Sequence, residues 1–272
     1  MTRAILLGTT GIAVAFGMLA FGYLAGHAPA QADDNPQVIQ VAGSDPALDR
    51  EAVETIIREY LLANPELILE VQQALDAKEK ERERIARLET IKEAKAEIFN
   101  AGYDGVVGNP DGKITIVEFY DYNCGYCKRA QADMLALTET DADLRFVLKE
   151  FPILGPDSTK AHVVSMAFRT LLPEKFGEFH NRLIAAPGRA GEASAMKIAL
   201  ELGADEAKLR EEMKNPAITE AFSTTYDLAQ RLSITGTPSY VVGTEVVFGA
   251  LGQDVLAEKI DEARACLLAA TC

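Results

Sequence analysis

The chain has 272 residues, with 41 acidic and 27 basic side chains and a formal net charge of −14. This length is enough for one domain with a substantial core and an accessory element. The acidic balance argues against nucleic acid as a partner and favours solubility.

The chain begins with a segment typical of exported proteins. Arg3 precedes an apolar run at residues 4–25, and Ala30-Gln31-Ala32 lies just before two aspartates. A basic start, an apolar run and an A-x-A site predict a secretory signal peptide at residues 1–32. The run is also long enough to span a bilayer, so an uncleaved membrane anchor is the alternative. Both place the remaining chain outside the cytoplasm, in the periplasm, where disulfides persist.

Residues 45–75 have the pattern of two amphipathic helices. Apolar side chains recur at helical spacing, first at Val53, Ile56, Ile57, Tyr60 and Leu61 and then at Leu67, Ile68, Val71 and Leu75. Asp45-Pro46 and Asn64-Pro65 are the predicted helix starts. Helices this short cannot bury their apolar faces alone, so we predict a module for self-association. Packing of these helices against the main domain is the alternative.

The pattern of residues 76–107 predicts a charged helical linker. Large apolar side chains are almost absent before Ile85, and Gly102 and Gly105 follow near the end. The charges alone indicate only a solvated helix face. Their position between an apolar module and the next domain favours a stalk or hinge.

Residues 108–272 have the pattern of an α/β domain. The segment KITIVEFY, residues 113–120, is apolar on both faces apart from Glu118, as in a central strand. A helix after Cys127 and a strand at 144–149 complete a β-α-β unit. The later expected elements are a helical region at about 158–232, strands within 236–242 and 245–248, and a terminal helix from about Gln253. We therefore predict an α/β fold with an inserted helical subdomain.

Two of the four cysteines, Cys124 and Cys127, lie in the segment FYDYNCGYCKRA between the first strand and its helix. A helix N-terminus stabilises a thiolate, the form of cysteine that attacks disulfides. Cys124 is therefore the predicted nucleophile. Cys127, one turn further on, is the predicted thiol that resolves a mixed disulfide. Lys128 and Arg129 either add positive potential at Cys124 or are merely solvated.

A lone C-x-x-C also occurs in zinc sites, where further ligands accompany it. His27, His162 and His180 do not lie at ligand spacing with Cys124, so the sequence indicates no metal ligand. The same lack of a nearby partner argues against a cysteine protease.

Glu118 is the charged residue in the otherwise apolar strand. A carboxylate in such a place must be protonated, paired or hydrated. It is either the proton acceptor for Cys127 when a mixed disulfide resolves, or one half of an ion pair with Lys149 on the neighbouring strand.

The remaining cysteines, Cys266 and Cys272, either form a structural disulfide or stay apart. Six residues of continuous helix span about 9 Å, which is too far for a disulfide. Pairing therefore requires the last helix to end near Leu268 and the tail to fold back.

Three features together resemble the DsbA-like branch of the thioredoxin-fold thiol oxidoreductases. They are FYDYNCGYC after an apolar strand, the helical insertion, and TGTP before a late strand. The resemblance covers residues 108–272. It implies a cis peptide bond between Thr237 and Pro238 that faces the cysteines, and it places the family's strand glutamate at Glu118.

Two details are similar to the disulfide-isomerase branch of that family. Gly125 and Tyr126 stand between the cysteines, where the oxidase pattern has Pro-His, and Thr237 precedes the proline. Tyr126, Thr237 and Pro238 are therefore expected to contact substrate. Residues 45–75, through EYLLANPELI, resemble the N-terminal module of the trimeric suppressor-of-copper-sensitivity C (ScsC) proteins. This second resemblance implies a homo-oligomer, as a trimer.

The resemblances imply a thiol-disulfide oxidoreductase, acting as an isomerase on unfolded or misoxidised exported proteins. Neither a metal nor an organic cofactor is expected, and a membrane redox partner would maintain the dithiol. The alternatives are a net dithiol oxidase of DsbA type and a non-catalytic chaperone or copper-binding protein.

Overall fold

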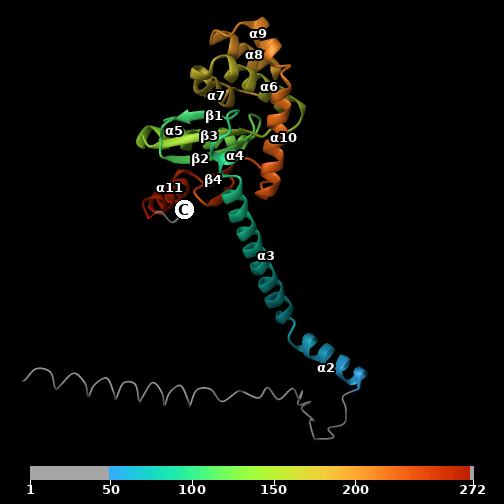
Figure 1. Ribbon diagram of the computed structural model, residues 1–272. Coiled ribbons are helices and arrows are strands. Elements are labelled where there is room, and N and C mark those ends of the chain that lie inside the picture. Colours follow the sequence, from blue (N-terminus) through green and yellow to red (C-terminus); the bar gives the residue numbers. More distant parts are fainter. Residues whose placement is uncertain (1–48, 270–272) are drawn as a thin grey trace, which may run out of the picture. The chain divides into compact units, whose positions relative to one another are not determined.

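The computed structural model describes residues 49–269, which divide after Pro65 into two units (Figure 1). The predicted signal peptide, the alternative anchor at residues 4–25 and Cys272 lie outside the described residues. Between residues 49 and 269, every helix is too short or too polar to span a bilayer.

The described part of the first unit contains helix α2 (Arg50–Ala63). The N-cap of α2 is Asp49, whose carboxylate accepts a hydrogen bond from the Ala52 N–H at 2.7 Å. The predicted start at Asp45-Pro46 lies outside the described residues, within which Asp49 satisfies a free N–H group at the start of α2. No side chain of α2 is buried, and Ile56, Ile57 and Tyr60 are more than half exposed. Within the described part of its unit, residues 49–65, the predicted apolar stripe thus has no cover.

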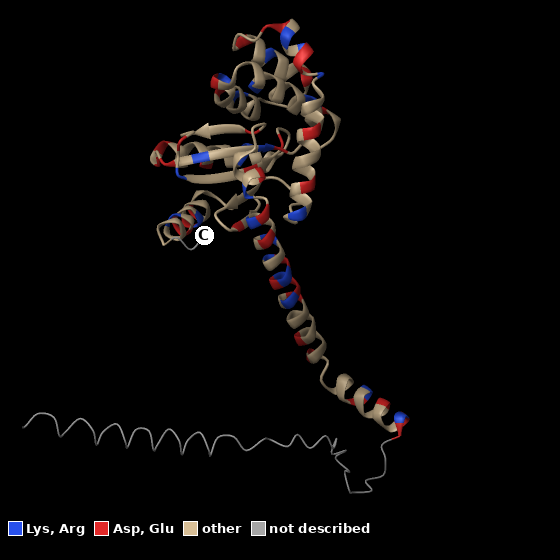
Figure 2. Cartoon of the chain, in the orientation of Figure 1, with Lys and Arg blue, Asp and Glu red and all other residues tan. Residues whose placement is uncertain are grey.

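The second unit opens with α3 (Glu66–Glu93), along which both signs of charge alternate (Figure 2). Side chains 68–86 of this helix are exposed, whereas Thr90 and Ile91 are buried. Ile91, together with Ala94 and with Ile98 of α4 (Lys95–Asn100), belongs to the core of the α/β domain. The last part of the segment predicted as a linker therefore packs in the core of the α/β domain and belongs to that domain.

A five-stranded sheet in the order β1-β3-β2-β4-β5 forms the centre of this domain. The strands are β1 (Gly105–Gly108), β2 (Ile114–Tyr120), β3 (Leu144–Glu150), β4 (Ser239–Val242) and β5 (Glu245–Phe248). β2 and β3 are parallel, and the other pairs are antiparallel. β1 was not predicted; it crosses the boundary between the predicted linker, 76–107, and the predicted α/β domain, which begins at Gly108.

Helices cover both faces of the sheet (Figure 1). Side chains alternate along β2, so Ile116 and Tyr120 pack in the core shared with α5 (Gly125–Thr140) and α11 (Gln253–Leu268). Val117 and Phe119 pack on the other face, with the end of α3, α4 and α10 (Pro216–Arg231). Each such fully buried side chain stabilises the fold by roughly 1.5–3 kcal/mol. Glu118 shares the α5 face, which points it toward the cysteines.

The predicted helical insertion corresponds to residues 156–231. It consists of α6 (Pro156–Leu171), η1 (Pro173–Lys175), α7 (Phe176–Ala185), α8 (Glu192–Glu201), α9 (Glu206–Glu212) and α10. α10 leaves this subdomain and returns to the sheet, where Leu228 and Ala229 are buried. The insertion therefore shares its core with the α/β domain on both sides.

Candidate active site

The two cysteines lie where β2 gives way to α5. Cys124 is the N-cap of α5, and its backbone N–H donates to the Asp121 carbonyl at 2.9 Å. Cys127 follows in the first turn and is fully buried, whereas Cys124 is 6% exposed. Both are free thiols in this structure. The helix geometry thus leaves Cys124 slightly exposed and encloses Cys127 completely.

The electrostatic surroundings differ in the same sense. A hydrogen bond from the Cys127 thiol is the main cause that lowers the pKa of Cys124 to about 5, with help from Thr237 and from the backbone N–H groups of Cys127 and Tyr126. Burial opposes this shift. Burial also raises the pKa of Cys127 far above its usual range, and the hydrogen bond to Cys124 acts in the same direction. The pair therefore combines a thiolate nucleophile with a protected thiol.

The late Thr237–Pro238 peptide bond completes the site. It is cis, as the resemblance implied. In its thiol form, Cys124 Sγ donates to the Thr237 carbonyl oxygen at 3.1 Å. A segment more than a hundred residues away in the sequence thus lies against the reactive sulfur.

We expect the thiolate of Cys124 to form at unusually low pH. Its ultraviolet absorbance in reduced protein should titrate with a midpoint near pH 5, and Cys124→Ser should remove that transition. One equivalent of iodoacetamide at mildly acidic pH should label Cys124 first. Titration near the ordinary thiol pKa of about 8.5, or preferential labelling of Cys127, would contradict the assignment.

Glu118 lies beside the cysteines, and no cation among residues 49–269 pairs with it. Its side chain is 4% exposed, and burial raises its pKa to about 8, with the charge of Cys124 adding to the shift and a hydrogen bond with Tyr240 opposing it. Tyr240 is its direct cross-strand neighbour on β4. A carboxyl group with a pKa near neutrality can accept or donate a proton at working pH.

The predicted alternative, an ion pair between Glu118 and Lys149, is wrong. Lys149 Nζ donates to Asp104 Oδ2 and to the Glu97 carbonyl, both at 2.6 Å. The register places Lys149 opposite Phe119, so its side chain points to the sheet face away from Glu118.

The variant Glu118→Gln should therefore separate kinetics from stability. The pKa of Glu118 is about 8 in the folded protein and 4.5 as the ordinary value. Protonated Glu118 therefore stabilises the wild type fully below about pH 4.5, and this contribution is lost as the pH rises through about 8. The melting temperature of Glu118→Gln relative to wild type should therefore rise between pH 5 and pH 9. Release of substrate from the Cys124 mixed disulfide should slow by about tenfold or more if Glu118 accepts the Cys127 proton. Unchanged release at all pH values would leave Glu118 without a role in catalysis.

The two cations after Cys127 have partners other than Cys124. Lys128 Nζ donates to the carbonyls of Ala186 and Gly188, at 2.9 and 3.2 Å, beyond the end of α7. The Arg129 guanidinium lies 4.3 Å from the ring centroid of Tyr126, which is 60% exposed. Lys128 thus ties α5 to the helical subdomain, and Arg129 supports an aromatic side chain at the rim of the site.

The loop before Cys124 is held in place by a buried set of hydrogen-bonded polar residues. The sequence did not reveal this set. Asp121 accepts from the N–H groups of Asn123 and Leu154 and from Ser158 Oγ, at 2.8 to 3.0 Å. Asn123 in turn exchanges hydrogen bonds with the backbone of Ala190. Only the Asp121–Asn123 turn has a local signal, since an aspartate often bonds the backbone two residues on. The other partners come from distant segments.

His162 belongs to the same set. Its Nε2 accepts from the Tyr122 N–H at 3.2 Å, and its Nδ1 contacts Glu150 Oε2. Glu150 Oε1 also accepts from Ser165 Oγ at 2.7 Å. The backbone two residues before Cys124 is therefore fixed by α6 and β3.

The remaining predicted sites have different outcomes. α11 ends at Leu268, which meets the condition set for a bond between Cys266 and Cys272, but Cys272 is outside the described residues and the disulfide stays a prediction. Within residues 49–269, no cluster of three or more His, Cys, Asp or Glu side chains is arranged to hold a metal ion.

The fold and the cysteine pair define this chain as a thiol-disulfide oxidoreductase. The sequence model of the DSBA-like thioredoxin domain family matches residues 115–261, which are more than half of the chain. The chain therefore belongs to that family. Residues 49–82 match the N-terminal domain of the copper resistance protein ScsC. That domain fits an oligomerisation module, and its range includes α2 and the first half of α3.

Individual relatives agree with this placement. Disulfide bond formation protein D of Bacillus subtilis is 26% identical over 173 residues, which cover 58% of this chain and 75% of that protein. A thioredoxin-like oxidoreductase from Silicibacter pomeroyi is 39% identical with a TM-score of 0.59, over 62% of this chain and 97% of that one. A periplasmic thioredoxin-like protein from Salmonella enterica is 26% identical with a TM-score of 0.58, over 63% and 95%.

Proposed function

We propose that this protein is a periplasmic disulfide isomerase that acts on unfolded or misoxidised exported proteins. The observation that supports thiol exchange is the asymmetry of the Cys-Gly-Tyr-Cys pair, with a pKa of about 5 at Cys124 and a buried thiol at Cys127. A stable thiolate serves an isomerase and an oxidase alike. The choice of an isomerase is supported instead by Gly125, Tyr126 and Thr237, which differ from the oxidase pattern, and by the ScsC-type match at residues 49–82.

Isomerisation starts when the Cys124 thiolate attacks a wrongly paired substrate disulfide. One sulfur of that disulfide bonds to Cys124 Sγ, and the other leaves as a substrate thiolate. A different substrate thiolate then attacks the mixed disulfide and expels Cys124 as a thiolate. The substrate disulfide has moved, and no electrons are gained or lost.

Cys127 releases the substrate from the mixed disulfide when no substrate thiol attacks. Its thiol loses a proton, with Glu118 as the proposed acceptor, and its sulfur displaces the substrate from Cys124. The substrate leaves reduced and the enzyme is left with a Cys124–Cys127 disulfide. A membrane redox partner must then supply two electrons and two protons to restore the dithiol.

Substrate contacts are proposed at the rim of the site. Tyr126 presents an exposed ring two residues after the nucleophile, and the Thr237 carbonyl oxygen lies 3.1 Å from Cys124 Sγ. Residues 237 and 238 form a bend that leads directly into β4, and the proposed substrate segment would pair beside them by main-chain hydrogen bonds. The cis proline itself offers no N–H to compete.

Self-association through α2 is proposed to complete the isomerase. The support is its uncovered apolar stripe together with the ScsC-type match at residues 49–82. An assembly, proposed as a trimer, would hold several active sites around one substrate and raise their effective concentration. Export to the periplasm rests on the predicted signal at residues 1–32.

Two assays distinguish the isomerase from a net dithiol oxidase. The isomerase should reactivate scrambled ribonuclease without added oxidant, whereas an oxidase should act only on reduced ribonuclease and stop after one turnover unless reoxidised. Cys124→Ser serves as the control, because a chaperone without thiol chemistry would keep its effect in that variant. Reactivation that is absent from the wild type would exclude the proposed isomerase.

A further inference from the structure

A separate cavity lies at the opposite end of the sheet from the cysteines. It has a volume of about 220 Å³ and opens among the first residues of β2 and β3, the turn after β4, and helices α3, α4 and α11. Ile114 and Thr115 line it, and Cys124 follows the far end of the same strand. At about 3.3 Å per residue, the strand separates the two places by roughly 20 Å. A ligand in this cavity is therefore not a substrate of the thiols.

The lining combines hydrocarbon with positive charge. Its apolar part includes Ile91, Phe99 and Leu267, and its charged residues are Lys92, Lys95, Lys113 and Arg145. None of the lining residues in the described part of the chain is acidic, although acidic residues outnumber basic ones by 41 to 27 in the full sequence. Four cations around one apolar cavity are unexpected in a protein of this composition.

These cations have no carboxylate to neutralise them. In the described part of the chain, none of the four makes an ion pair. Arg145 is fixed in the wall by neutral groups, because its guanidinium donates to Thr115 Oγ1 and to the Phe99 carbonyl. Like charges held together repel each other, and a bound anion would relieve that repulsion.

The shape of the cavity defines the rest of the ligand. A volume of 220 Å³ corresponds to about seven groups the size of a water molecule, which is a hydrocarbon chain of about seven or eight carbons. Transfer of such a chain from water to the apolar lining is favourable. We propose that this cavity binds a single-chain amphiphile with an anionic head, the head among the four cations and the chain against Ile91, Phe99 and Leu267.

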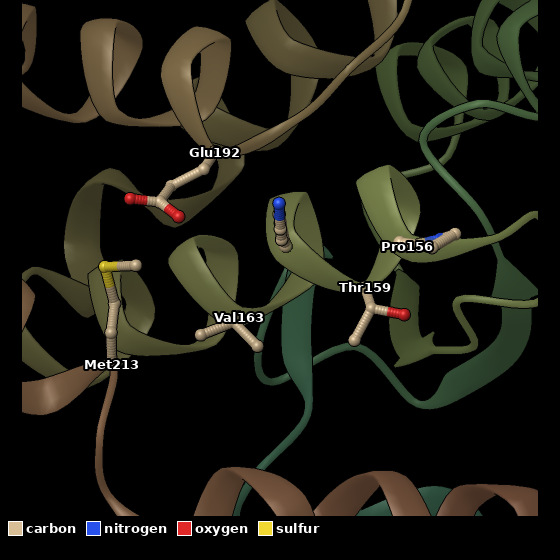
Figure 3. A pocket seen from close by; sticks show the side chains of 6 residues that line it. Pro156, Thr159, Val163, Glu192 and Met213 are labelled. Carbon is tan, nitrogen blue, oxygen red and sulfur yellow. The ribbon is translucent and has the colours of Figure 1, made fainter.

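The larger cavity of the helical subdomain lacks this selectivity. It measures about 470 Å³ and is lined along the outer side of α6 by Pro156, Thr159 and Val163, with Glu192 and Met213 opposite (Figure 3). Among the described residues that line it, Lys160 is the one cation and Glu192 the one carboxylate. Opposite charges in equal number favour neither an anion nor a cation, so the inference does not extend to this cavity.

The test compares three ligands of equal chain length on the purified reduced chain. Octanoate should bind saturably and shift the methyl resonances of Ile91, Ile114 and Leu267, while octanol and octylammonium should bind at least tenfold more weakly. Binding should also raise the melting temperature, since a ligand that binds only the folded state stabilises it. Comparison of the affinities of octyl phosphate and octanoate shows whether the cavity prefers a phosphate or a carboxylate head. Either preference supports the proposal, because both ligands are anionic amphiphiles.

Variants locate the charge and the hydrocarbon contacts separately. The triple variant Lys92→Gln, Lys95→Gln, Lys113→Gln changes three exposed side chains and should weaken octanoate at least tenfold. Its matched control is Lys78→Gln, Lys80→Gln, Arg82→Gln, which removes the same charge from the exposed part of α3 and should bind as wild type. Leu267→Asp, at a half-exposed position, should weaken binding as well. Equal binding of octanoate and octanol, equal binding of inorganic phosphate, or octanoate affinity unchanged in the triple variant would each overturn the proposal.

Discussion

The variant Cys127→Ser is expected to accumulate as a mixed disulfide with its substrate. In the wild type, Cys127 lies one turn from Cys124 and can displace the bound substrate, whereas a serine hydroxyl cannot attack a disulfide. The adduct should survive denaturing electrophoresis and disappear on reduction. Cys124→Ser should form no adduct, and its insulin reduction should fall about a hundredfold or more, to the uncatalysed rate.

The two cysteine variants make a matched pair, because each removes one sulfur from the same turn of α5. Circular dichroism should show both folded. Adducts on Cys127 in the Cys124→Ser protein, with activity retained, would reverse the roles assigned to the two thiols.

The double variant Ile56→Asp, Leu61→Asp should abolish self-association and most isomerisation. Both side chains lie on the exposed stripe of α2, and an interface would force two carboxylates into a desolvated apolar seam. We expect a monomer by light scattering, insulin reduction within about twofold of wild type, and loss of about tenfold in reactivation of scrambled ribonuclease.

The control for this variant places the same charge on the opposite side of α2. At 100° per residue, Thr55 and Leu62 lie across the helix from the stripe, and Leu62 is 72% exposed. Thr55→Asp, Leu62→Asp should therefore assemble and isomerise as the wild type does. If the stripe variant remains oligomeric, or becomes monomeric and isomerises normally, the proposed role of α2 is wrong.

A truncation that tests the same module should end before the buried part of α3. Ile91, Ala94 and Ile98 pack in the core of the α/β domain, so removal of residues 33 to about 100 would open that core. Deletion of residues 33–85 leaves these contacts in place. It should give a folded monomer that retains insulin reduction.

The parts of the fold that the sequence predicts are those with strong local patterns. KITIVEFY and LRFVLK form β2 and β3, the helices after them follow, and TGTP contains the cis bond. β1 escaped prediction because four residues, two of them glycine, carry no strand pattern, and its place at the edge depends on pairing with β3.

The candidate site divides in the same way. The roles of Cys124 and Cys127 follow from their spacing after a strand, and Thr237 and Pro238 follow from the family resemblance. The partner of Lys149 could not be chosen from the sequence, because Glu118 and Asp104 are both carboxylates and only the register excludes Glu118. The hydrogen bond from the Tyr122 N–H to His162 joins residues that lie 40 apart in the sequence, and no local sequence pattern predicts it.

The redox state of Cys124 and Cys127 in living cells tests the central claim most directly. Rapid acid quenching followed by alkylation with a mass-tagged reagent would count the free thiols in the wild type, with Cys124→Ser and Cys127→Ser as markers of the shifted bands. The account predicts that the pair is largely reduced, since an isomerase must begin each cycle with the Cys124 thiolate. A pair found largely as the Cys124–Cys127 disulfide would contradict the isomerase and make the protein a net dithiol oxidase.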